Sequence, residues 1–185
     1  MAIAVLLAAC SAPGLGGSGD SAGAADNPAR QPVERGPDLA PFDPALFDEN
    51  SATIDNEWWP LTPGTQLVLE GTTTEAGEQI SHRFVVTVTD LTKEIAGIRT
   101  RVLFDRDYSD GQLIEAELAL FAQDRDGNVW HFGQYVEEWD ETGFIGAHAW
   151  LQGYLEDAHA GIMVPANPQL NMPDYSQGFA PDPIT

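Results

Sequence analysis

The stretch QDRDGNVWHFGQYVEEWDE, residues 123–141, holds the residue types and spacings that most strongly suggest chemistry. Its first half has the alternating oxygen-bearing side chains of a calcium loop. An EF-hand loop with Gly127 at its sixth position needs oxygen ligands at its first and twelfth positions, where this sequence has Ala122 and Gly133. Asp126-Gly127 between two apolar runs is instead typical of a hairpin turn. We therefore predict a tight turn between two strands.

The second half of this stretch and the residues after it supply three candidate metal ligands, His131, Glu137 and His148. They could bind one divalent cation if the strands that carry them are neighbours. No two histidines have the i, i+4 spacing of a helical zinc site, and the single cysteine lies near the N-terminus. We expect no other cofactor. The alternative interpretation places each of the three side chains at the surface or in partial packing.

Paired carboxylates are a second candidate, because Glu115 and Glu117 lie two residues apart and would share one face of a strand. Two carboxylates on one face could perform glycosidase chemistry. Chance pairs are expected, however, in a chain with 29 acidic residues. Arg99 and Arg101 on the preceding predicted strand could face the glutamates and form a cross-strand charge ladder, which is the interpretation that we favour.

Tryptophan side chains are the third candidate, because indole faces stack on sugar rings or apolar ligands. The chain has five tryptophans, and we take Trp58, Trp130, Trp139 and Trp150 as candidate ligand-binding residues. The alternative is that tryptophans fill the core at the ends of a sheet. We expect this structural role most clearly for Trp59, which precedes a proline-containing turn.

Composition limits the classes of function. The chain has 29 acidic and 8 basic residues, and its formal net charge of −21 repels nucleic acid. The same charge favours divalent cations or cationic partners. Residues 42–185, the part expected to fold, contain no Gly-x-Ser-x-Gly elbow, no phosphate-binding loop and no dinucleotide-binding fingerprint. We therefore expect no nucleic-acid partner.

The N-terminal residues predict a lipid anchor. An apolar run ends in Leu-Ala-Ala-Cys10, which resembles a bacterial lipobox. We interpret residues 1–10 as the remnant of a lipoprotein signal, with the native start upstream because no basic residue precedes the run. Residues 11–41 are rich in Gly, Ser, Ala and Pro and predict a disordered tether. The protein is thus expected outside the cytoplasm in the bacterial cell envelope, attached to a membrane through its lipid.

Residues 42–185 predict an all-β domain, with one short helical or irregular piece near residues 44–48. Apolar and polar residues alternate along five segments, and turn residues such as Asp110-Gly111 separate them. Short connections favour antiparallel pairing of consecutive strands, so we predict a meander that forms an open or partly closed barrel-like sheet. One more apolar piece follows near residues 149–155, then loop; without a closing strand, we expect the native chain to continue beyond Thr185. The predicted strands are residues 66–70, 79–94, 97–108, 112–124 and 128–139.

A resemblance rests on three segments, NEWWPLTPGTQLVLEG, the long run from VTVTDLTKE to DGNVWHFGQ, and GIMVPANPQ. In this order they are similar to a group of uncharacterised bacterial exported proteins and lipoproteins. The resemblance covers roughly residues 57–169. It implies an exported β-rich domain with a further β-rich segment after it, and it implies no activity and no catalytic residues.

These observations favour a non-catalytic role, in which the domain binds a small molecule, a glycan or a protein partner at the cell envelope. The first alternative is a hydrolase or metal-dependent enzyme that uses acidic and histidine side chains around His131–His148. The second is a purely structural envelope protein. The ligand, any reaction and the oligomeric state are not defined by the sequence.

The predicted anchor can be tested by removing its thiol. When the chain is expressed with its full upstream sequence, a Cys10→Ser variant should leave the membrane fraction, because serine cannot receive the lipid through a thioether. Fractionation of cells followed by immunoblotting measures this. If Cys10→Ser stays in the membrane fraction, the lipobox interpretation is wrong.

Overall fold

The computed structural model describes residues 39–75, 77–154 and 158–180 of the chain. All of them belong to one compact unit, residues 35–185. The predicted lipidation site Cys10, the signal remnant at residues 1–10 and all but the last three residues of the predicted tether lie outside the described residues.

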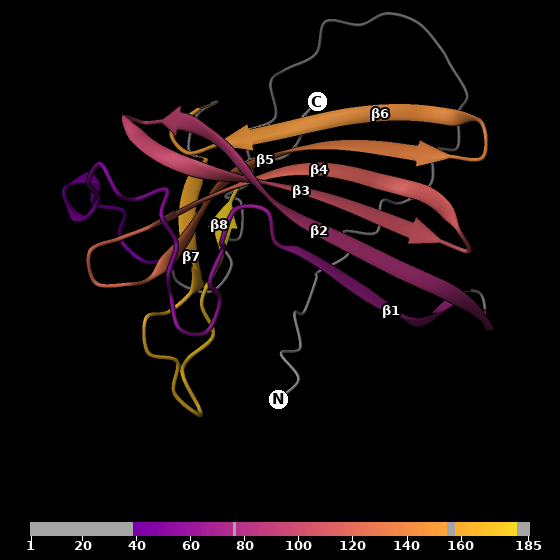
Figure 1. Cartoon of the computed structure of the whole chain (residues 1–185), viewed down its shortest axis with the longest axis horizontal. Coiled ribbons are helices and arrows are strands. Elements are labelled where there is room, and N and C mark those ends of the chain that lie inside the picture. The colour runs from indigo at the N-terminus through magenta and orange to yellow at the C-terminus, as the bar shows by residue number, and fades with distance from the viewer. Residues whose placement is uncertain (1–38, 76, 155–157, 181–185) are drawn as a thin grey trace, which may run out of the picture. The chain divides into compact units, whose positions relative to one another are not determined.

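The predicted all-β fold is confirmed: the strands form one open antiparallel sheet that is not closed into a barrel (Figure 1). Strands β1 to β5 pair in sequence order, β6 and β7 both pair with the same edge of β5, and β8 pairs with β7. Among the described residues, the one helix is a 3₁₀ turn, η1. The elements are η1 (Pro44–Leu46), β1 (Gln66–Glu75), β2 (Glu78–Ile95), β3 (Ile98–Ser109), β4 (Gln112–Gln123), β5 (Val129–Asp140), β6 (Gly143–Leu151), β7 (His159–Val164) and β8 (Gly178–Phe179).

Two-residue turns fix the register of the central hairpins. Asp110 and Gly111 both have positive φ, 48° and 81°, as a type I′ turn requires. This turn places Ser109 of β3 opposite Gln112 of β4 and confirms the predicted hairpin. Ala96 and Gly97 make the same kind of turn between β2 and β3, with φ of 51° and 80°. The rest of each strand follows from these pairs, except where a bulge intervenes.

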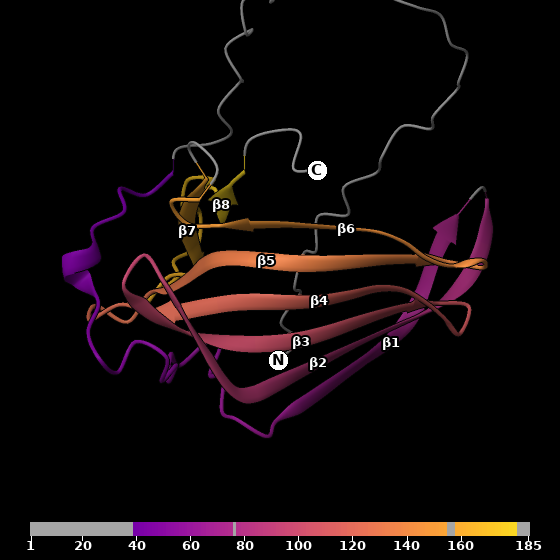
Figure 2. The same ribbon diagram turned by 90° about the horizontal axis from the view of Figure 1, so that it is seen from above.

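A bulge at Phe132 divides β5 into two parts. Leu120 of β4 lies opposite Gly133, but the next residue, Phe121, lies opposite His131. Gly133 has φ of +141°, and a Cβ atom there would lie 2.2 Å from the carbonyl oxygen of Trp150. The part of β5 after the bulge pairs with β6, and the part before it pairs with β7 (Figure 2). Strand β7 falls in a region that the sequence predicted as loop.

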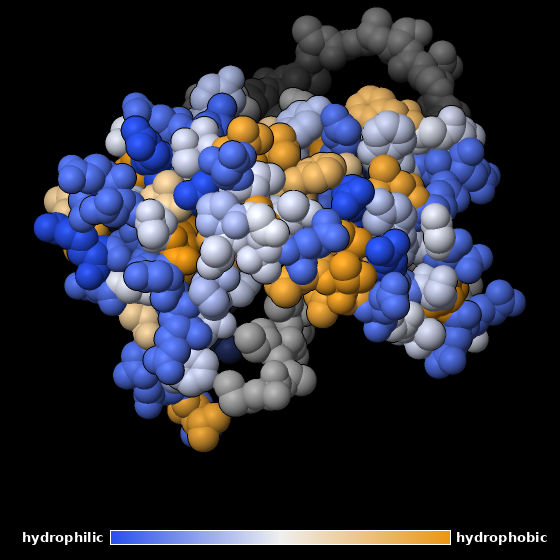
Figure 3. Space-filling view, in the orientation of Figure 1, coloured by the Kyte–Doolittle hydropathy of each residue, from blue (hydrophilic) through white to orange (hydrophobic). Residues whose placement is uncertain are grey.

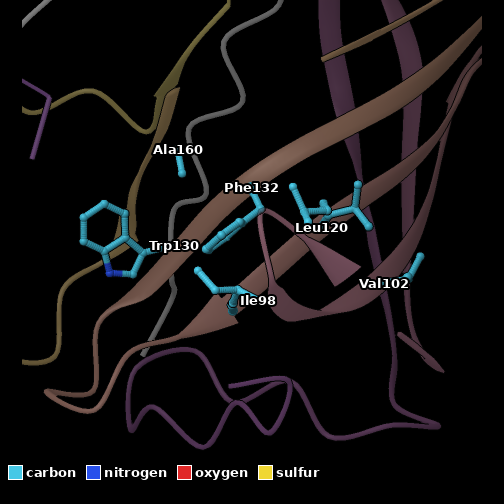
Figure 4. Close-up of a cluster of buried hydrophobic side chains, with 8 residues drawn as sticks. Ile98, Val102, Leu120, Trp130, Phe132 and Ala160 are labelled. Atoms are coloured by element: carbon cyan, nitrogen blue, oxygen red, sulfur yellow. The ribbon is translucent and has the colours of Figure 1, made fainter. Parts of the chain in front are cut away.

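The core lies at one end of the sheet, where residues from the N-terminal segment cover both faces. On one face, Phe42 and Phe47 pack edge-on against Trp130 and Phe132, with ring centroids 5.3–6.1 Å apart. Figure 4 shows Trp130 and Phe132 of β5 beside side chains from β3 and β4. These contacts hold the segment before β1 against the sheet.

On the opposite face, Ile54 and Leu61 are buried against Leu103 of β3 and Ala119 of β4. Trp59 joins this cluster with its ring 4.9 Å from that of Phe121, which agrees with its predicted structural role. The N-terminal segment thus covers both faces at the same end of the sheet. The β3–β4 turn lies at the other end. The described residues contain no helix of sufficient length and apolar character to span a membrane.

The predicted turn between β4 and β5 is confirmed, and Asp124 organises it. Its carboxylate accepts hydrogen bonds from the backbone N–H groups of Asp126 (3.0 Å) and Asn128 (2.8 Å). It also accepts from Asn128 Nδ2 at 2.9 Å and from the buried Trp130 Nε1 at 2.8 Å. Since four donors occupy this carboxylate, the segment is a structural turn that ties the indole of Trp130 to the loop.

Substitution at this turn should separate a structural role from calcium binding. We expect Asp124→Ala to lower the free energy of unfolding by about 3 kcal/mol or more, because several buried donors lose a charged acceptor. Asp126→Ala removes a neighbouring exposed carboxylate and should change stability by less than about 0.5 kcal/mol. Urea denaturation measures both. A rise in the Tm of the wild type on adding calcium that Asp126→Ala abolishes would contradict the assignment as a turn.

Candidate functional site

His131 is a half-buried residue that packs between aromatic rings. Its ring stacks on Phe121 with centroids 4.9 Å apart and meets Trp150 edge-on at the same distance. Burial lowers the pKa of His131 to about 4, so the imidazole is neutral at physiological pH. The residue therefore packs as a flat neutral ring, as the alternative interpretation expected.

The structure does not bring the other two candidate metal ligands to His131. Glu137 lies opposite Ala116 of β4 and accepts a hydrogen bond from the Tyr135 hydroxyl at 3.0 Å. His148 lies opposite Val136 of β5, and since neighbouring residues on a strand point to opposite faces, it is on the other side of the sheet from Glu137. In the part of the chain that the structure describes, no three His, Cys, Asp or Glu side chains are arranged to hold a metal ion.

The four candidate tryptophans have different roles. Trp130 is 2% exposed in the core, and Trp150 is buried against His131. Trp58 is 38% exposed at the surface. Trp139 lines an open pocket, and its buried Nε1 has no hydrogen-bond partner among the described residues.

The predicted charge ladder is wrong, because the register places acids opposite acids. Asp105 of β3 lies directly opposite Glu117 of β4, and Asp107 lies directly opposite Glu115. The arginines are elsewhere: Arg101 lies opposite Phe121 and donates its Nε–H to the backbone oxygen of Ala52, and Arg99 lies opposite Glu94. The two glutamates therefore face like charges.

These four carboxyl groups define what we call the acid face, with Asp105 and Glu117 as its inner pair and Asp107 and Glu115 as its outer pair. Asp105 follows Leu103 by two residues on β3, so the acids lie on the same side of the sheet as Leu103 and Ala119. The cover from the N-terminal segment packs on those apolar residues. The acid face continues from there toward the hairpin ends.

Apolar side chains flank both pairs on the β2 side and the inner pair on the β5 side, whereas Glu138 of β5 lies opposite Glu115 of the outer pair. Phe84 and Val86 of β2 lie opposite Asp107 and Asp105, and the buried Val136 of β5 lies opposite Glu117. Asp105 is only 9% exposed, and no hydrogen bond from the described residues reaches its Oδ1. Like charges directly opposite one another destabilise a strand pair, and an unsatisfied buried carboxyl oxygen adds to this cost.

Burial and repulsion hold protons on these groups. Burial, followed by the charge of Glu115, raises the pKa of Asp105 to about 7. Burial, followed by the charges of Asp105 and Glu115, raises the pKa of Glu117 to about 8. Burial also raises the pKa values of Asp107 and Glu115. The four groups therefore carry fewer than four negative charges at neutral pH.

Two histidines border the acid face. His82 Nε2 lies 2.6 Å from Asp107 Oδ1, and this contact lowers the pKa of Asp107 against the larger effect of burial. The charge of His148 lowers the pKa of Glu115, against burial and the charges of Asp107 and Glu138. The histidines thus act on the outer pair, whereas the inner pair has the most strongly raised pKa values.

An open pocket of about 450 Å³ lies at the hairpin ends of the sheet. Ser109 and Gln112, the residues opposite each other at the β3–β4 turn, line it together with Ile114 of the same hairpin. Ser109 follows Asp107 by two residues, so this pocket adjoins the outer pair. The remaining lining residues are Glu78, Gln79, Ile80, Asp110, Trp139, Asp140 and Glu141.

The sheet also leaves apolar side chains at its surface, and hydrophobic groups gather over the middle of the face seen in Figure 3. Edge strand β1 contributes Leu67, Val68 and Leu69, each nearly half exposed. Neither the pocket at the hairpin ends nor the one near Asp124 is lined by these residues. The acid face combines burial, opposed charges and an adjoining pocket, and it is the candidate functional site.

Comparison of the chain with protein families, curated proteins and solved structures found no match. The site therefore rests on its geometry. Sequence reasoning identified Glu115 and Glu117 but missed Asp105 and Asp107. The available signal was the motif Asp-Arg-Asp, which places two acids on one face of a predicted strand next to the strand of the two glutamates.

The raised pKa values make a prediction about stability and pH. An acid whose pKa is raised in the folded state stabilises the fold fully below its unfolded pKa, near 4, and loses this contribution as pH rises through the folded value. For Asp105 and Glu117 this loss extends to about pH 8. His131 has the opposite sign, since its pKa is lowered to about 4, but its contribution is complete above about pH 6.5.

The free energy of unfolding should therefore fall between pH 6.5 and 8.5. The double variant Asp105→Asn/Glu117→Gln should flatten this decline and be more stable than the wild type at pH 8.5 by about 1–3 kcal/mol. The surface control Asp90→Asn/Glu94→Gln removes the same number of charges from exposed positions and should keep the decline. Urea titrations at each pH measure this; equal slopes in the wild type and the acid-face variant would refute the assignment.

Proposed function

We propose that this chain is a lipid-anchored, non-catalytic β domain that binds a small organic cation on its acid face, outside the cytoplasm. The observation that carries the proposal is the inner pair, in which the buried Asp105 lies directly opposite the half-buried Glu117. The anchor is supported by Cys10 and the residues before it in the sequence.

The inner pair is costly for the empty protein. Two carboxyl groups that face each other among apolar side chains either repel each other as anions or retain protons. Neither state provides the favourable cross-strand contact that stabilises an ordinary pair of strands. Such violations of local rules gather at functional sites, where a ligand supplies the missing interaction. A cation placed between Asp105 and Glu117 would satisfy both carboxylates and the unpaired Oδ1.

The charge of the whole chain supports the same ligand class. A formal net charge of −21 attracts cations toward the surface over distances of about 10 Å at moderate salt. Four further carboxylates surround the pocket next to the outer pair, at Glu78, Asp110, Asp140 and Glu141. A cation would therefore meet favourable potential before it reaches the acid face.

A hydrolase is the second candidate function, since Asp105 and Glu117 are paired carboxyl groups of the kind that acid–base catalysis uses. Acid–base catalysis needs two groups whose pKa values are pushed apart, so that one is protonated while the other is ionised. Here the pKa values of Asp105 and Glu117 are both raised, to about 7 and about 8. The two values lie close together and are not pushed apart, so the pair does not match the acid–base arrangement of a hydrolase.

Titration of the purified chain with spermidine and with agmatine at low ionic strength tests the proposal. Both cations should raise the Tm and give saturable heat in calorimetry, because they bind the folded acid face. Asp105→Asn/Glu117→Gln should remove this response.

The surface control Asp90→Asn/Glu94→Gln should keep the response, since it removes two carboxylates from exposed positions without changing the acid face. An equal loss of binding in both double variants would show that the cations bind only to the general negative charge. That result, or the absence of saturable binding to the wild type, would overturn the proposed function.

A further inference from the structure

We propose that the acid face binds linear α,ω-diamines whose two ammonium groups are separated by four or five methylene groups. This inference rests on the proposed function and specifies its ligand. One ammonium would lie at the inner pair, Asp105 and Glu117, and the other at the outer pair, Asp107 and Glu115.

The spacing of the two pairs sets the length of the ligand. Asp105 and Asp107 lie two residues apart on β3, as do Glu115 and Glu117 on β4. Two residues of an antiparallel strand span about 6.8 Å. An extended chain of bonds about 1.5 Å long advances about 1.25 Å per bond, so the nitrogens of 1,4-diaminobutane and 1,5-diaminopentane lie about 6.3 and 7.5 Å apart. Both distances match the separation of the pairs.

The walls of the acid face suit the methylene chain. Phe84 and Val86 border the acids on the β2 side, and Val136 borders Glu117 on the β5 side. A ligand with apolar carbons between two charges would cover these side chains while its ends meet the carboxyl groups. A hydrated metal ion offers no such complement and requires six or more oxygen ligands in the case of calcium.

A primary ammonium suits the hydrogen-bonding needs of each pair. Asp105 is nine-tenths buried, and its Oδ1 has no partner among the described residues. An ammonium carries three N–H donors that point in different directions, so it can donate to two carboxylates that face it from different strands. A guanidinium has its donors in one plane and binds best to a single carboxylate in a bidentate manner.

Access to the acid face is available from the pocket. The outer pair is half-buried, with the side chain of Asp107 19% exposed, and the pocket lined by Ser109, Ile114 and Trp139 begins beside it. A diamine can reach the inner pair along the acid face, one end first. The outer end then remains at Asp107 and Glu115, next to the pocket.

The test compares alkanediamines with a monoamine. Calorimetric titration at pH 8 should show that 1,4-diaminobutane and 1,5-diaminopentane bind at least about tenfold more tightly than butylamine, 1,3-diaminopropane or 1,8-diaminooctane. Only the first two place an ammonium at each pair without strain or a folded chain. The wild type and the surface control Asp90→Asn/Glu94→Gln should give the same order.

Removing either pair of carboxyl groups should abolish the difference in affinity between the diamine and the monoamine. In Asp105→Asn/Glu117→Gln, and separately in Asp107→Asn/Glu115→Gln, 1,4-diaminobutane should bind no more tightly than butylamine. This comparison within each variant holds even if a substitution changes the overall affinity.

The outcomes separate this inference from the proposed function. If spermidine and agmatine bind but affinity does not depend on diamine length, or the advantage survives loss of one pair, the diamine inference is overturned and the function as a cation-binding domain remains. If no organic cation binds the wild type with saturation, both are overturned.

Discussion

One extra residue in β4 determines which side chains meet on the acid face. The Asp110-Gly111 turn pairs Ser109 with Gln112, and an unbroken ladder from there would place Arg106 opposite Glu115 and Phe104 opposite Glu117. The bulge at Ile114 shifts the register by one, so that the glutamates meet Asp107 and Asp105 instead. A one-residue shift moves side chains to the opposite face of a sheet, and bulges are common beside functional sites. The opposed acids, their raised pKa values and the proposed ligand all depend on this register.

The sheet tolerates these acids because its stability comes from its other end. There Phe42 and Phe47 cover Trp130 and Phe132 on one face, and residues 52–61 cover Leu103 and Ala119 on the other. The transition from apolar to acidic side chains occurs within two residues along β3 and along β4. The same strands therefore serve a packed core at one end and a charged, partly open surface at the other. This division allows a costly arrangement of charge without loss of the fold.

The sequence was sufficient for features that depend on local pattern. Alternation predicted five of the strands, Asp110-Gly111 predicted a hairpin, and the failure of the calcium pattern at Ala122 and Gly133 predicted a turn. Features that depend on register or on distant packing were not accessible. No local signal marks Ile114 as a bulge, and none sets the register that keeps Arg99 and Arg101 away from Glu115 and Glu117. The pairing of β7 with the same edge of β5 as β6 depends on the bulge at Phe132. The neutral state of His131 depends on Phe121 and Trp150, which pack around its ring.

Burial of the acid face makes proton binding and cation binding alternatives to each other. The apolar neighbours Phe84, Val86 and Val136 weaken solvation of the carboxylates, which raises their pKa values. The same low polarity strengthens the attraction between a carboxylate and an ammonium ion, because charges are screened less there than in water. A dication that binds must displace the protons retained by Asp105 and Glu117, so its affinity is linked to pH through these two groups. A surface pair of acids would lack both properties, since water would keep it ionised and would screen the ligand. The register of β3 against β4, which places these acids opposite each other next to apolar side chains, therefore makes the site favour cations and makes cation affinity depend on pH.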